Sequence, residues 1–441
     1  MSMLIAACIA LFSALEASAE RPNVVIIFTD DQGSLDMGAY GAEDLKTPHM
    51  DALAAEGVRF TQFYAAAPVC SPSRASLLTG RYPTMAGMPT NAGQQGLPQS
   101  EVTLGDLFQG AGYATALVGK WHLGHEHEST PNRQGFDYFF GHLGGCIDNY
   151  SHFFYWAGPN RHDLWENDTE IYRDGEFFPA MMVDEALQWI DGVEEQPFFL
   201  YFALNTPHYP YQGTPEWLAY YRERGVPYPR DLYNAFLSTT DDQIGRLLSA
   251  LDDRGLRENT IVVFQSDHGY SVEERAHFGG GYAGPYRGAK FSLFEGGIRV
   301  PAIISWPGKL PAGAVRDQMA HSCDWFPTLA ELAGVPLPEV ALNGRSLAEL
   351  LQRADAPSPH EVLHWEFPTN RWAVRKGDWK LLGNPMDPTL DEPLPEGAYL
   401  YNLADDPGEQ TNLAEEHPEI VEQLMAHYGE FQQMVADSKQ D

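Results

Sequence analysis

The chain has 441 residues, of which 28 are basic and 61 acidic, so its formal net charge at pH 7 is −33. An apolar fraction of 44% and an aromatic fraction of 12% exclude a disordered chain, because disordered segments lack the apolar surface that builds a core. The length predicts a large domain with a smaller one, or two to three ordinary domains, and the acidity argues against partners such as nucleic acid or anionic lipid, which attract basic surfaces.

The first 19 residues have the pattern of a signal peptide. Residues 4–15 form an apolar run that is shorter than the ~20 residues of a membrane-spanning helix. Ala17-Ser18-Ala19 is a small-residue cleavage site. Alternatives are a buried N-terminal helix, because Lys and Arg are missing before the run, and acylation at Cys8. No later segment is long and apolar enough to cross a membrane. We therefore expect an exported protein, located in the periplasm, outside the cell or in a lysosome-like compartment.

Strands and helices alternate through the first part of the chain. The β-branched run 23–28 predicts a buried strand, and Thr47-Pro48 predicts the start of a helix that ends at Gly57. The same patterns predict helices at 74–78, 103–109, 182–190 and 231–251 and strands at 113–118, 198–202 and 261–265. This alternation is typical of an α/β fold, in which helices flank a mainly parallel central sheet.

The pattern changes after about residue 355, where two prolines in residues 354–360 predict a linker. Short strands at 372–375, 379–382 and 399–403 and an amphipathic helix at 418–435 predict a small C-terminal antiparallel sheet with a helix. We therefore divide the chain into a signal peptide (1–19), a main domain (20–355) and a C-terminal subdomain (356–441).

The cysteines do not form a disulfide framework. Cys8 leaves with the signal peptide, so Cys70, Cys146 and Cys323 remain, an odd number for an exported protein. Cys146 and Cys323 either pair or stay as buried thiols. Cys70 is the candidate for a separate role.

Several polar motifs occur along the chain, and those at 30–31, 207–210 and 266–269 follow predicted strands, where parallel α/β sheets bind their ligands. The motifs are Asp30-Asp31, Cys70-Ser71-Pro72-Ser73-Arg74, Gly119-Lys120-Trp121-His122, Pro207-His208-Tyr209-Pro210, Ser266-Asp267-His268-Gly269 and Gly288-Ala289-Lys290. In this order they resemble those of the type I sulfatases, the formylglycine-dependent members of the alkaline phosphatase superfamily. The resemblance extends over about residues 21–382 and implies an alkaline-phosphatase-like fold, with 20–355 as the catalytic domain.

The resemblance implies that Cys70 is the nucleophile. Cys70-x-Pro72-x-Arg74 with Thr79-Gly80-Arg81 is similar to the segment that the family's formylglycine-generating maturation enzyme recognises. Cys70 would be oxidised to Cα-formylglycine, whose aldehyde hydrates to a geminal diol. One hydroxyl attacks sulfur and displaces the alcohol; the other then loses its proton, expels sulfate and regenerates the aldehyde.

The resemblance also implies a divalent cation. Asp30, Asp31 and Asp267 supply carboxylates, which suit Ca²⁺, and the side chain of residue 70 completes the site. His268 stands where many sulfatases have Asn, and imidazole is a poor match for Ca²⁺, so its place among the ligands is less secure than that of the carboxylates.

Cationic and titratable side chains complete the set that the resemblance implies. Arg74 would hold the diol and the aspartates, although a surface salt bridge is its alternative. Lys120 and Lys290 would bind sulfate oxygens. His122 would orient the diol or take its proton, and His208 would protonate the leaving alcohol, because histidine titrates near neutral pH.

The substrate is predicted from an aromatic loop. The chain as a whole resembles arylsulfatases A and B. Residues 136–152 are similar to the N-acetylgalactosamine-4-sulfatase branch of that family. The long loop 146–176 favours a binding role over a passive connection. We expect sulfate esters of a polysaccharide or glycosaminoglycan as the substrate. The candidate contacts are Asn149, His152, Trp156, Trp165 and Arg287.

Two other functions stay open at this point, as does the oligomeric state. One is a phosphodiesterase or phosphonate monoester hydrolase of the same superfamily, because their metal sites resemble this one. The other is a non-catalytic protein that binds sulfated glycans and keeps Cys70 unmodified.

Overall fold

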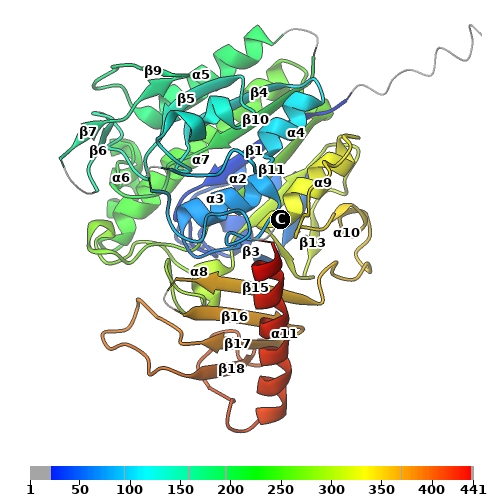
Figure 1. Cartoon of the computed structure of the whole chain (residues 1–441). Helices are drawn as coiled ribbons and strands as arrows, with labels where there is room; N and C mark the ends of the chain where they lie inside the picture. Colours follow the sequence, from blue (N-terminus) through cyan, green and yellow to red (C-terminus); the bar gives the residue numbers. More distant parts are fainter. Residues whose placement is uncertain (1–20, 94, 157–158, 194–195, 369, 439–441) are drawn as a thin grey trace, which may run out of the picture.

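A sheet of ten strands forms the centre of the main domain (Figure 1). The computed structural model describes residues 21–438 apart from 94, 157–158, 194–195 and 369, so the signal peptide predicted at 1–19 lies outside the described residues. In spatial order the strands are β13 (Ala314–Arg316), β2 (Val58–Phe60), β12 (Ala302–Ser305), β11 (Thr260–Ser266), β1 (Asn23–Thr29), β10 (Phe198–Ala203), β4 (Ala114–Lys120), β5 (Tyr138–His142), β8 (Trp165–Glu166) and β9 (Thr169–Glu170).

The middle of this sheet is parallel. The pairs β11–β1, β1–β10, β10–β4 and β4–β5 all run in the same direction. Antiparallel pairs lie toward the margins, where β12 joins β11 to β2 and β8 joins β5 to β9. The predicted α/β fold with a mainly parallel sheet is thus confirmed. Because parallel strands share a direction, the carboxyl ends of four neighbours meet at one edge.

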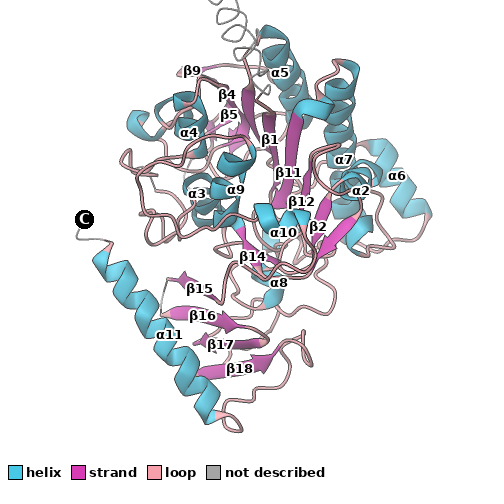
Figure 2. Ribbon diagram, turned by 90° about the vertical axis from the view of Figure 1, so that its right-hand side faces the viewer, coloured by secondary structure: helices cyan, strands magenta, loops and turns pink. Residues whose placement is uncertain are grey.

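Helices cover both faces of the sheet, as Figure 2 shows. Alternate residues of β1 point to opposite faces: Val24, Ile26 and Phe28 belong to one hydrophobic core, and Val25 and Ile27 to another. Because both faces of β1 are buried in a core, its sequence is an almost uninterrupted apolar run. The first core is covered by α3 (Cys70–Thr79), α4 (Leu104–Gly110) and α9 (Trp325–Leu332), and the second by α2 (Pro48–Glu56), α5 (Phe178–Gly192) and α7 (Arg230–Asp253).

The shorter elements lie around this centre. Helix α6 (Pro215–Glu223) packs on α7, α10 (Ala348–Gln352) packs on α9, and α8 (Glu295–Ile298) follows the last of the polar motifs. Two small sheets are formed by β3 (Phe63–Tyr64) with β14 (Ala320–His321) and by β6 (Phe153–Phe154) with β7 (Arg161–His162). The predicted loop 146–176 therefore contains short strands.

The C-terminal part is a separate four-stranded antiparallel sheet with a helix across it, as predicted (Figures 1 and 2). The helix is α11 (Pro418–Asp437), and the strands are β15 (Val362–Phe367), β16 (Arg371–Lys376), β17 (Trp379–Gly383) and β18 (Ala398–Asn402). Strand β15 was not predicted. The domain boundary at residue 355 stays a prediction.

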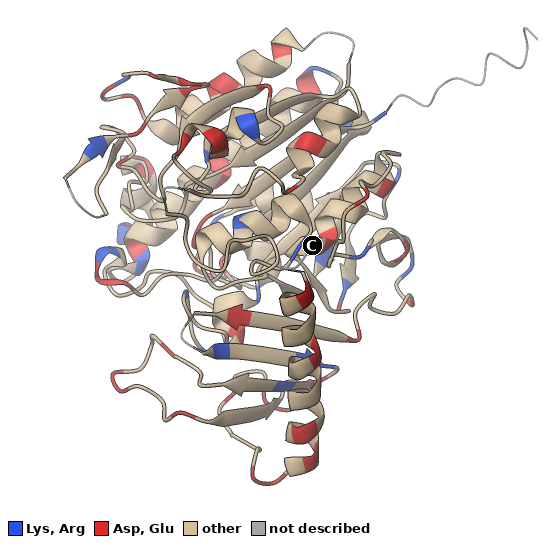
Figure 3. Cartoon of the chain, in the orientation of Figure 1, with Lys and Arg blue, Asp and Glu red and all other residues tan. Residues whose placement is uncertain are grey.

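Acidic side chains are spread over helices and loops of both parts of the chain (Figure 3). Helix α11, for example, carries acidic residues and neither Lys nor Arg. None of the helices in the described part of the chain combines the length and apolar character of a membrane span.

Because the protein is acidic as a whole, a site for an anionic ligand has to gather its cationic side chains locally.

Candidate active site

The predicted site residues converge where the parallel strands end. Asp30 follows β1, Asp267 follows β11, and Lys120 is the last residue of β4. Backbone hydrogen bonds hold these ends together: the Asp267 N–H donates to the Thr29 carbonyl, and the Asp30 N–H donates to the Thr206 carbonyl, both at 3.0 Å. Sheet topology thus brings together motifs that lie more than two hundred residues apart in the chain.

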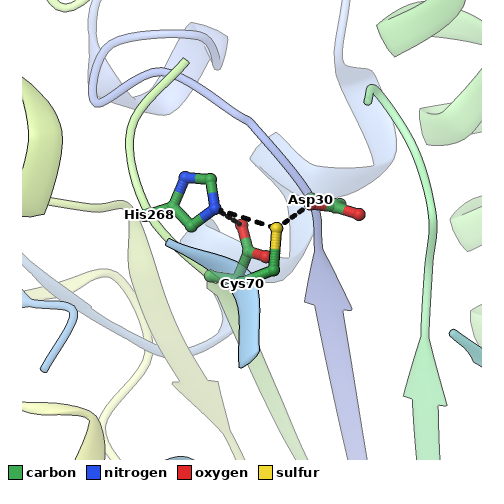
Figure 4. A group of neighbouring side chains, drawn as sticks. Asp30, Cys70 and His268 are labelled. Atoms are coloured by element: carbon green, nitrogen blue, oxygen red, sulfur yellow. Dashed lines mark hydrogen bonds and ion pairs between the residues drawn. The ribbon is translucent and has the colours of Figure 1, made fainter. Parts of the chain in front are cut away.

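Cys70 is the first residue of α3 and faces the strand ends (Figure 4). Its Sγ lies 3.6 Å from Asp30 Oδ1 and 3.3 Å from His268 Nε2. Pro72 is tolerated here because the first turn of a helix has no intrahelical partner for its N–H. Burial alone would raise the pKa of the thiol, but Lys120 and Lys290 outweigh it and lower the pKa to about 6. Residue 70 therefore lies where negative charge is stabilised.

Arg74 lies one helical turn after Cys70 and is fully buried. Its guanidinium Nη2 lies 3.4 Å from Asp267 Oδ2 and 3.6 Å from Asp30 Oδ2, and its Nη1 donates to the Lys120 carbonyl. The alternative of a surface salt bridge is wrong. Arg74 ties α3 to three of the strand ends at once.

The carboxylates fit a divalent cation. Asp30, Cys70, Asp267 and His268 each offer a ligand atom, and these atoms lie within 4.8 Å of one another. Asp31 Oδ1 lies 3.5 Å from His268 Nε2. Burial and the nearby Asp30 carboxylate raise the pKa of Asp31 to about 8 and that of Asp267 to about 7, so the cluster holds more negative charge than its surroundings support. Three buried carboxylates around one point form a donor set that suits a hard cation.

His268 has one ring nitrogen available to this cluster. Its Nδ1 lies 2.9 Å from the Gly269 carbonyl, which directs Nε2 toward Cys70 and the aspartates. Burial lowers the pKa of His268, but Asp267 and the Cys70 thiol outweigh it and raise the pKa to about 9. These neighbours therefore favour the protonated imidazole, and ligation of a metal by Nε2 requires the loss of that proton.

Two of these residues have strained backbones. Asp31 has φ of 62° and His122 has φ of 55°, in the left-handed region that non-glycine residues seldom adopt. Such conformations persist where surrounding contacts enforce them, and they concentrate at functional sites. The Asp31 N–H donates to Asp267 Oδ1 at 3.1 Å, which is one such contact.

A cavity of about 270 Å³ opens above Cys70. Lys290 lines it, with Nζ 3.0 Å from Asp31 Oδ1 and 3.5 Å from Glu273 Oε2. Lys120 lies beneath it, fully buried and paired with the Asp30 carboxylate. The other lining residues are Asn91, Ala92, His122, His125, Gly145, Cys146, Phe154, Trp156, His208, Glu273 and Phe291.

Two of the three histidines that line the cavity, His122 and His208, lie where the neutral imidazole is favoured. His208 lies with Nε2 3.7 Å from Asp31 Oδ2 and Nδ1 2.7 Å from the Tyr209 carbonyl. Burial and Lys290 hold its pKa well below the usual range, and burial and Lys120 do the same for His122. An anion bound in the cavity would raise both pKa values, because it favours the charged imidazolium.

Most of the predicted substrate contacts lie away from the Cys70 cavity. Trp156 lines it, and Trp165 lines the adjoining cavity. Asn149 and His152 are fully buried, bonded to Gln212 and to the Glu176 carbonyl, respectively. Arg287 bonds to Asp387 Oδ2 at 2.7 Å and to the Glu409 carbonyl. All five stay predictions, and the structure brings Trp156 nearest to Cys70.

Several lining residues carry no sequence signal. Glu273 and His125 belong to no recognisable motif, and Cys146 was considered only as a partner of Cys323. Cys70, Cys146 and Cys323 are all free, buried thiols. The proposed alternative of a Cys146–Cys323 pair is therefore wrong.

Comparisons with known proteins agree with this geometry. The family model described as "Sulfatase" matches residues 22–335, and that described as "N-sulphoglucosamine sulphohydrolase, C-terminal" matches residues 288–434. Arylsulfatase A of Homo sapiens is 35% identical to this chain, in an alignment of 459 positions that covers 92% of this chain and 87% of that protein. N-acetylgalactosamine-6-sulfatase of Sus scrofa is 37% identical over 364 residues, which cover 74% of this chain and 65% of that protein.

Solved structures show the same likeness. "Crystal structure of Ps i-CgsB in complex with k-i-k-neocarrahexaose" matches with a TM-score of 0.82 at 28% identity and covers 93% of each chain. The phosphonate monoester hydrolase of Agrobacterium radiobacter matches with a TM-score of 0.69 at 21% identity, over 95% of this chain and 96% of that one. The second match is a likeness of fold alone.

Proposed function

The chain belongs to the sulfatase family and is a sulfuric ester hydrolase, and from this premise we propose that it removes O-sulfate groups from a polysaccharide or glycosaminoglycan. The observation that carries the proposal is the position of Cys70, at a helix start between Asp30 and His268 and beneath a cavity lined by Lys290 and His208. The proposal includes export of the chain and its maturation by a formylglycine-generating enzyme.

We propose that residue 70 is converted to formylglycine and that Asp30, Asp31, Asp267 and His268 hold one Ca²⁺ beside it. When present, the hydrated aldehyde supplies the attacking hydroxyl and the cation draws charge from the sulfate oxygens. The clustered carboxylates support this proposal, because burial and the neighbouring Asp30 raise the pKa values of Asp31 and Asp267, and a bound cation would stabilise their ionised forms.

The chain's own cations would stabilise the charge that develops on the sulfate. Lys290 faces the cavity, and Lys120 and Arg74 lie behind residue 70. Charges that are fixed before the reaction stabilise a transition state without further reorganisation. Arg74 acts as a positioning residue, because it contacts the aspartates and α3 rather than the cavity.

His122 and His208 would transfer protons during the reaction. His208 lines the cavity beside Lys290, where the leaving oxygen of the ester would lie, and would donate a proton to it. His122 lines the cavity beside Gly145 and would take a proton from residue 70 when sulfate leaves. Binding of an anionic ester prepares His208 for this role by raising its pKa.

Carbohydrate substrates are supported by the relatives. One solved relative holds a neocarrahexaose, and a curated relative is named for N-acetylgalactosamine-6-sulfate. The narrower form of the proposal is a 4-sulfate ester as the substrate, because residues 136–152 are similar to the N-acetylgalactosamine-4-sulfatase branch. N-acetylgalactosamine 4-sulfate and 6-sulfate, tested side by side, distinguish the two positions.

The reaction class is tested with three small esters. We expect the matured enzyme to cleave an aryl sulfate with a kcat/KM at least ~100-fold above that for an aryl phosphodiester or phosphonate monoester, since the chain belongs to the sulfatase family. Release of the nitrophenol group from each ester is measured under the same conditions. A preference for the phosphodiester or phosphonate would overturn the proposal.

His208 is tested by varying the leaving group. His208→Gln is expected to lower kcat/KM for a sugar sulfate by about 10²–10⁴-fold, because a sugar alkoxide needs a proton as it leaves. The loss for nitrophenyl sulfate should be smaller, since nitrophenolate leaves without protonation. His427→Gln, on the distant helix α11, is the matched control and should leave both rates unchanged. Equal losses for both substrates would show that His208 is not the acid.

A further inference from the structure

A second and larger cavity adjoins the one above Cys70. It has a volume of about 630 Å³ and shares Ala92, His125 and Phe154 with the Cys70 cavity. Much of its wall comes from the segment between β6 and β9, which includes Arg161, Asp163 and Trp165. The shared residues show that the two cavities are adjacent, so the second cavity lies where a neighbouring unit of a ligand anchored at residue 70 would be expected.

Arg161 gives this second cavity a free positive charge. Its guanidinium lies 4.1 Å from the centre of the Phe154 ring, and Nη2 lies 3.4 Å from His125 Nε2. Among the described residues, Arg161 forms no ion pair with a carboxylate. Other exposed or partly exposed arginines, such as Arg133, Arg173 and Arg246, are paired with carboxylates.

The carboxylates that line the cavity are already engaged. Asp163 is buried and accepts hydrogen bonds from the Leu143 N–H, the Gly144 N–H and the Trp165 indole N–H. Asp168 pairs with Arg133 at 3.4 Å. Among the Arg, Lys, Asp and Glu side chains that line this cavity, the Arg161 guanidinium is therefore the cation, and it has no oppositely charged partner in the described structure.

Trp165 adds an apolar surface at the same place. Its indole N–H donates to Asp163 Oδ1 at 2.9 Å, which fixes the ring, and the side chain remains partly exposed in the cavity wall. Aromatic faces contact the apolar faces of sugar rings, and a guanidinium binds sulfate or carboxylate through paired hydrogen bonds. Cavity, cation and aromatic surface together match a sugar unit with an anionic substituent.

We propose that this second cavity, the Arg161 cavity, binds the neighbouring sugar of the substrate chain through an anionic substituent on that sugar, a sulfate or a carboxylate. The inference rests on the proposed function and deepens it. The preferred substrate is then an oligosaccharide with two anionic groups on adjacent units: the ester that is cleaved, above Cys70, and a second group at Arg161. A small aryl sulfate occupies the first cavity alone.

The test compares Arg161→Gln with the wild type on four substrates. They are an aryl sulfate, a disaccharide with the cleavable sulfate alone, the same disaccharide with a second sulfate on the neighbouring unit, and the same disaccharide with a carboxylate there. We expect kcat/KM for the doubly anionic disaccharides to fall about 10- to 100-fold, mainly through KM, while the rates for the other two stay unchanged. The doubly anionic substrate that loses more identifies the substituent.

Arg246→Gln, an exposed arginine on α7 that pairs with Asp184, is the matched control for the lost charge. In the wild type the advantage of the doubly anionic substrates should also shrink as the salt concentration rises. Equal losses on all four substrates, or no loss on any, would overturn the inference while the sulfatase proposal stands. If the matured wild type releases sulfate from none of the four, the proposed function itself fails.

Discussion

Replacing Cys70 by alanine is expected to lower kcat/KM for sulfate esters by about 10⁴-fold or more while the protein stays folded. The side chain is the only group at the start of α3 that faces both the carboxylates and the cavity, so its loss removes the attacking atom. Its removal leaves the packing of α3 nearly intact, because the rest of the helix is buried independently. Sulfate release and thermal unfolding, measured on the same preparation, separate the two effects.

Cys323→Ala is the matched control, because Cys323 is also a buried free thiol but does not line the cavity. It should retain activity. The mass of the peptide with residue 70, from protein made with a formylglycine-generating enzyme, should be about 18 Da below that of the unmodified peptide. A full-mass peptide from active protein would contradict the proposed nucleophile, as would near wild-type activity of Cys70→Ala.

Replacing Lys380 by methionine is expected to destabilise the protein by about 3–5 kcal/mol, because it removes one cation from a buried charge cluster. Lys380 lies on β17 of the C-terminal sheet, and its Nζ lies 2.9 Å from a carboxylate oxygen of both Glu295 and Glu409. All three side chains are fully buried. Without Lys380, the two carboxylates face each other with no solvent to screen them, and the free energy of unfolding, measured with denaturant, should fall.

The neighbours of Lys380 indicate which of the two carboxylates, Glu295 or Glu409, is destabilised more when Lys380 is lost. Burial and Glu295 raise the pKa of Glu409 to about 7 even with Lys380 present, whereas Glu295 has Arg299 at 3.2 Å as a second partner. Adding Glu409→Gln to Lys380→Met should therefore recover part of the lost stability. Lys376→Met, which removes a partly exposed lysine of β16 whose partner Glu361 is exposed, is the control and should change stability by less than ~1 kcal/mol. Equal effects of the two lysine variants would show that the cluster does not stabilise the fold.

The Lys380 cluster also connects the C-terminal sheet to the active site. Glu295 begins α8, and the Gly296 carbonyl of that helix lies so close to Gly269 that a side chain there would collide with it. Gly269 follows His268 directly. Loss of Lys380 is therefore expected to disturb the loop that would hold the cation, in addition to lowering stability.

Much of the fold was predictable because hydrophobic patterns are local. Strands β1, β10 and β11 are short apolar runs with polar residues directly after them, and α7 and α11 show helical periodicity over five or more turns. Strand β15 was not predicted, although Leu363 and Trp365 alternate with more polar residues as in a half-buried strand, because it closely follows the proline-containing segment 354–360 that predicts a linker. The α/β class, the antiparallel C-terminal sheet and the order of the motifs all followed from the sequence.

The contacts of the site were decided by the tertiary structure. Sequence alone placed Asp30, Asp267 and Cys70 among the candidates, but only the sheet order shows that Arg74 is buried between the two aspartates. The sequence also suggested Arg287 as a substrate contact, whereas in the folded chain its guanidinium donates a hydrogen bond to Asp387. The sequence indicated the loop 146–176 and Trp165, but nothing in it distinguished Arg161 or showed the cavity that these residues line.

The physical reason is the range of the interactions. A strand or helix is specified by residues within a few positions of one another, so the sequence by itself determined these elements and the chemical types placed at their ends. The partner of a charged side chain depends on segments that meet only when the chain packs, such as α3 against the ends of β1 and β11. The burial of these side chains, their pKa shifts and the adjacency of the two cavities were therefore decided by the tertiary structure alone.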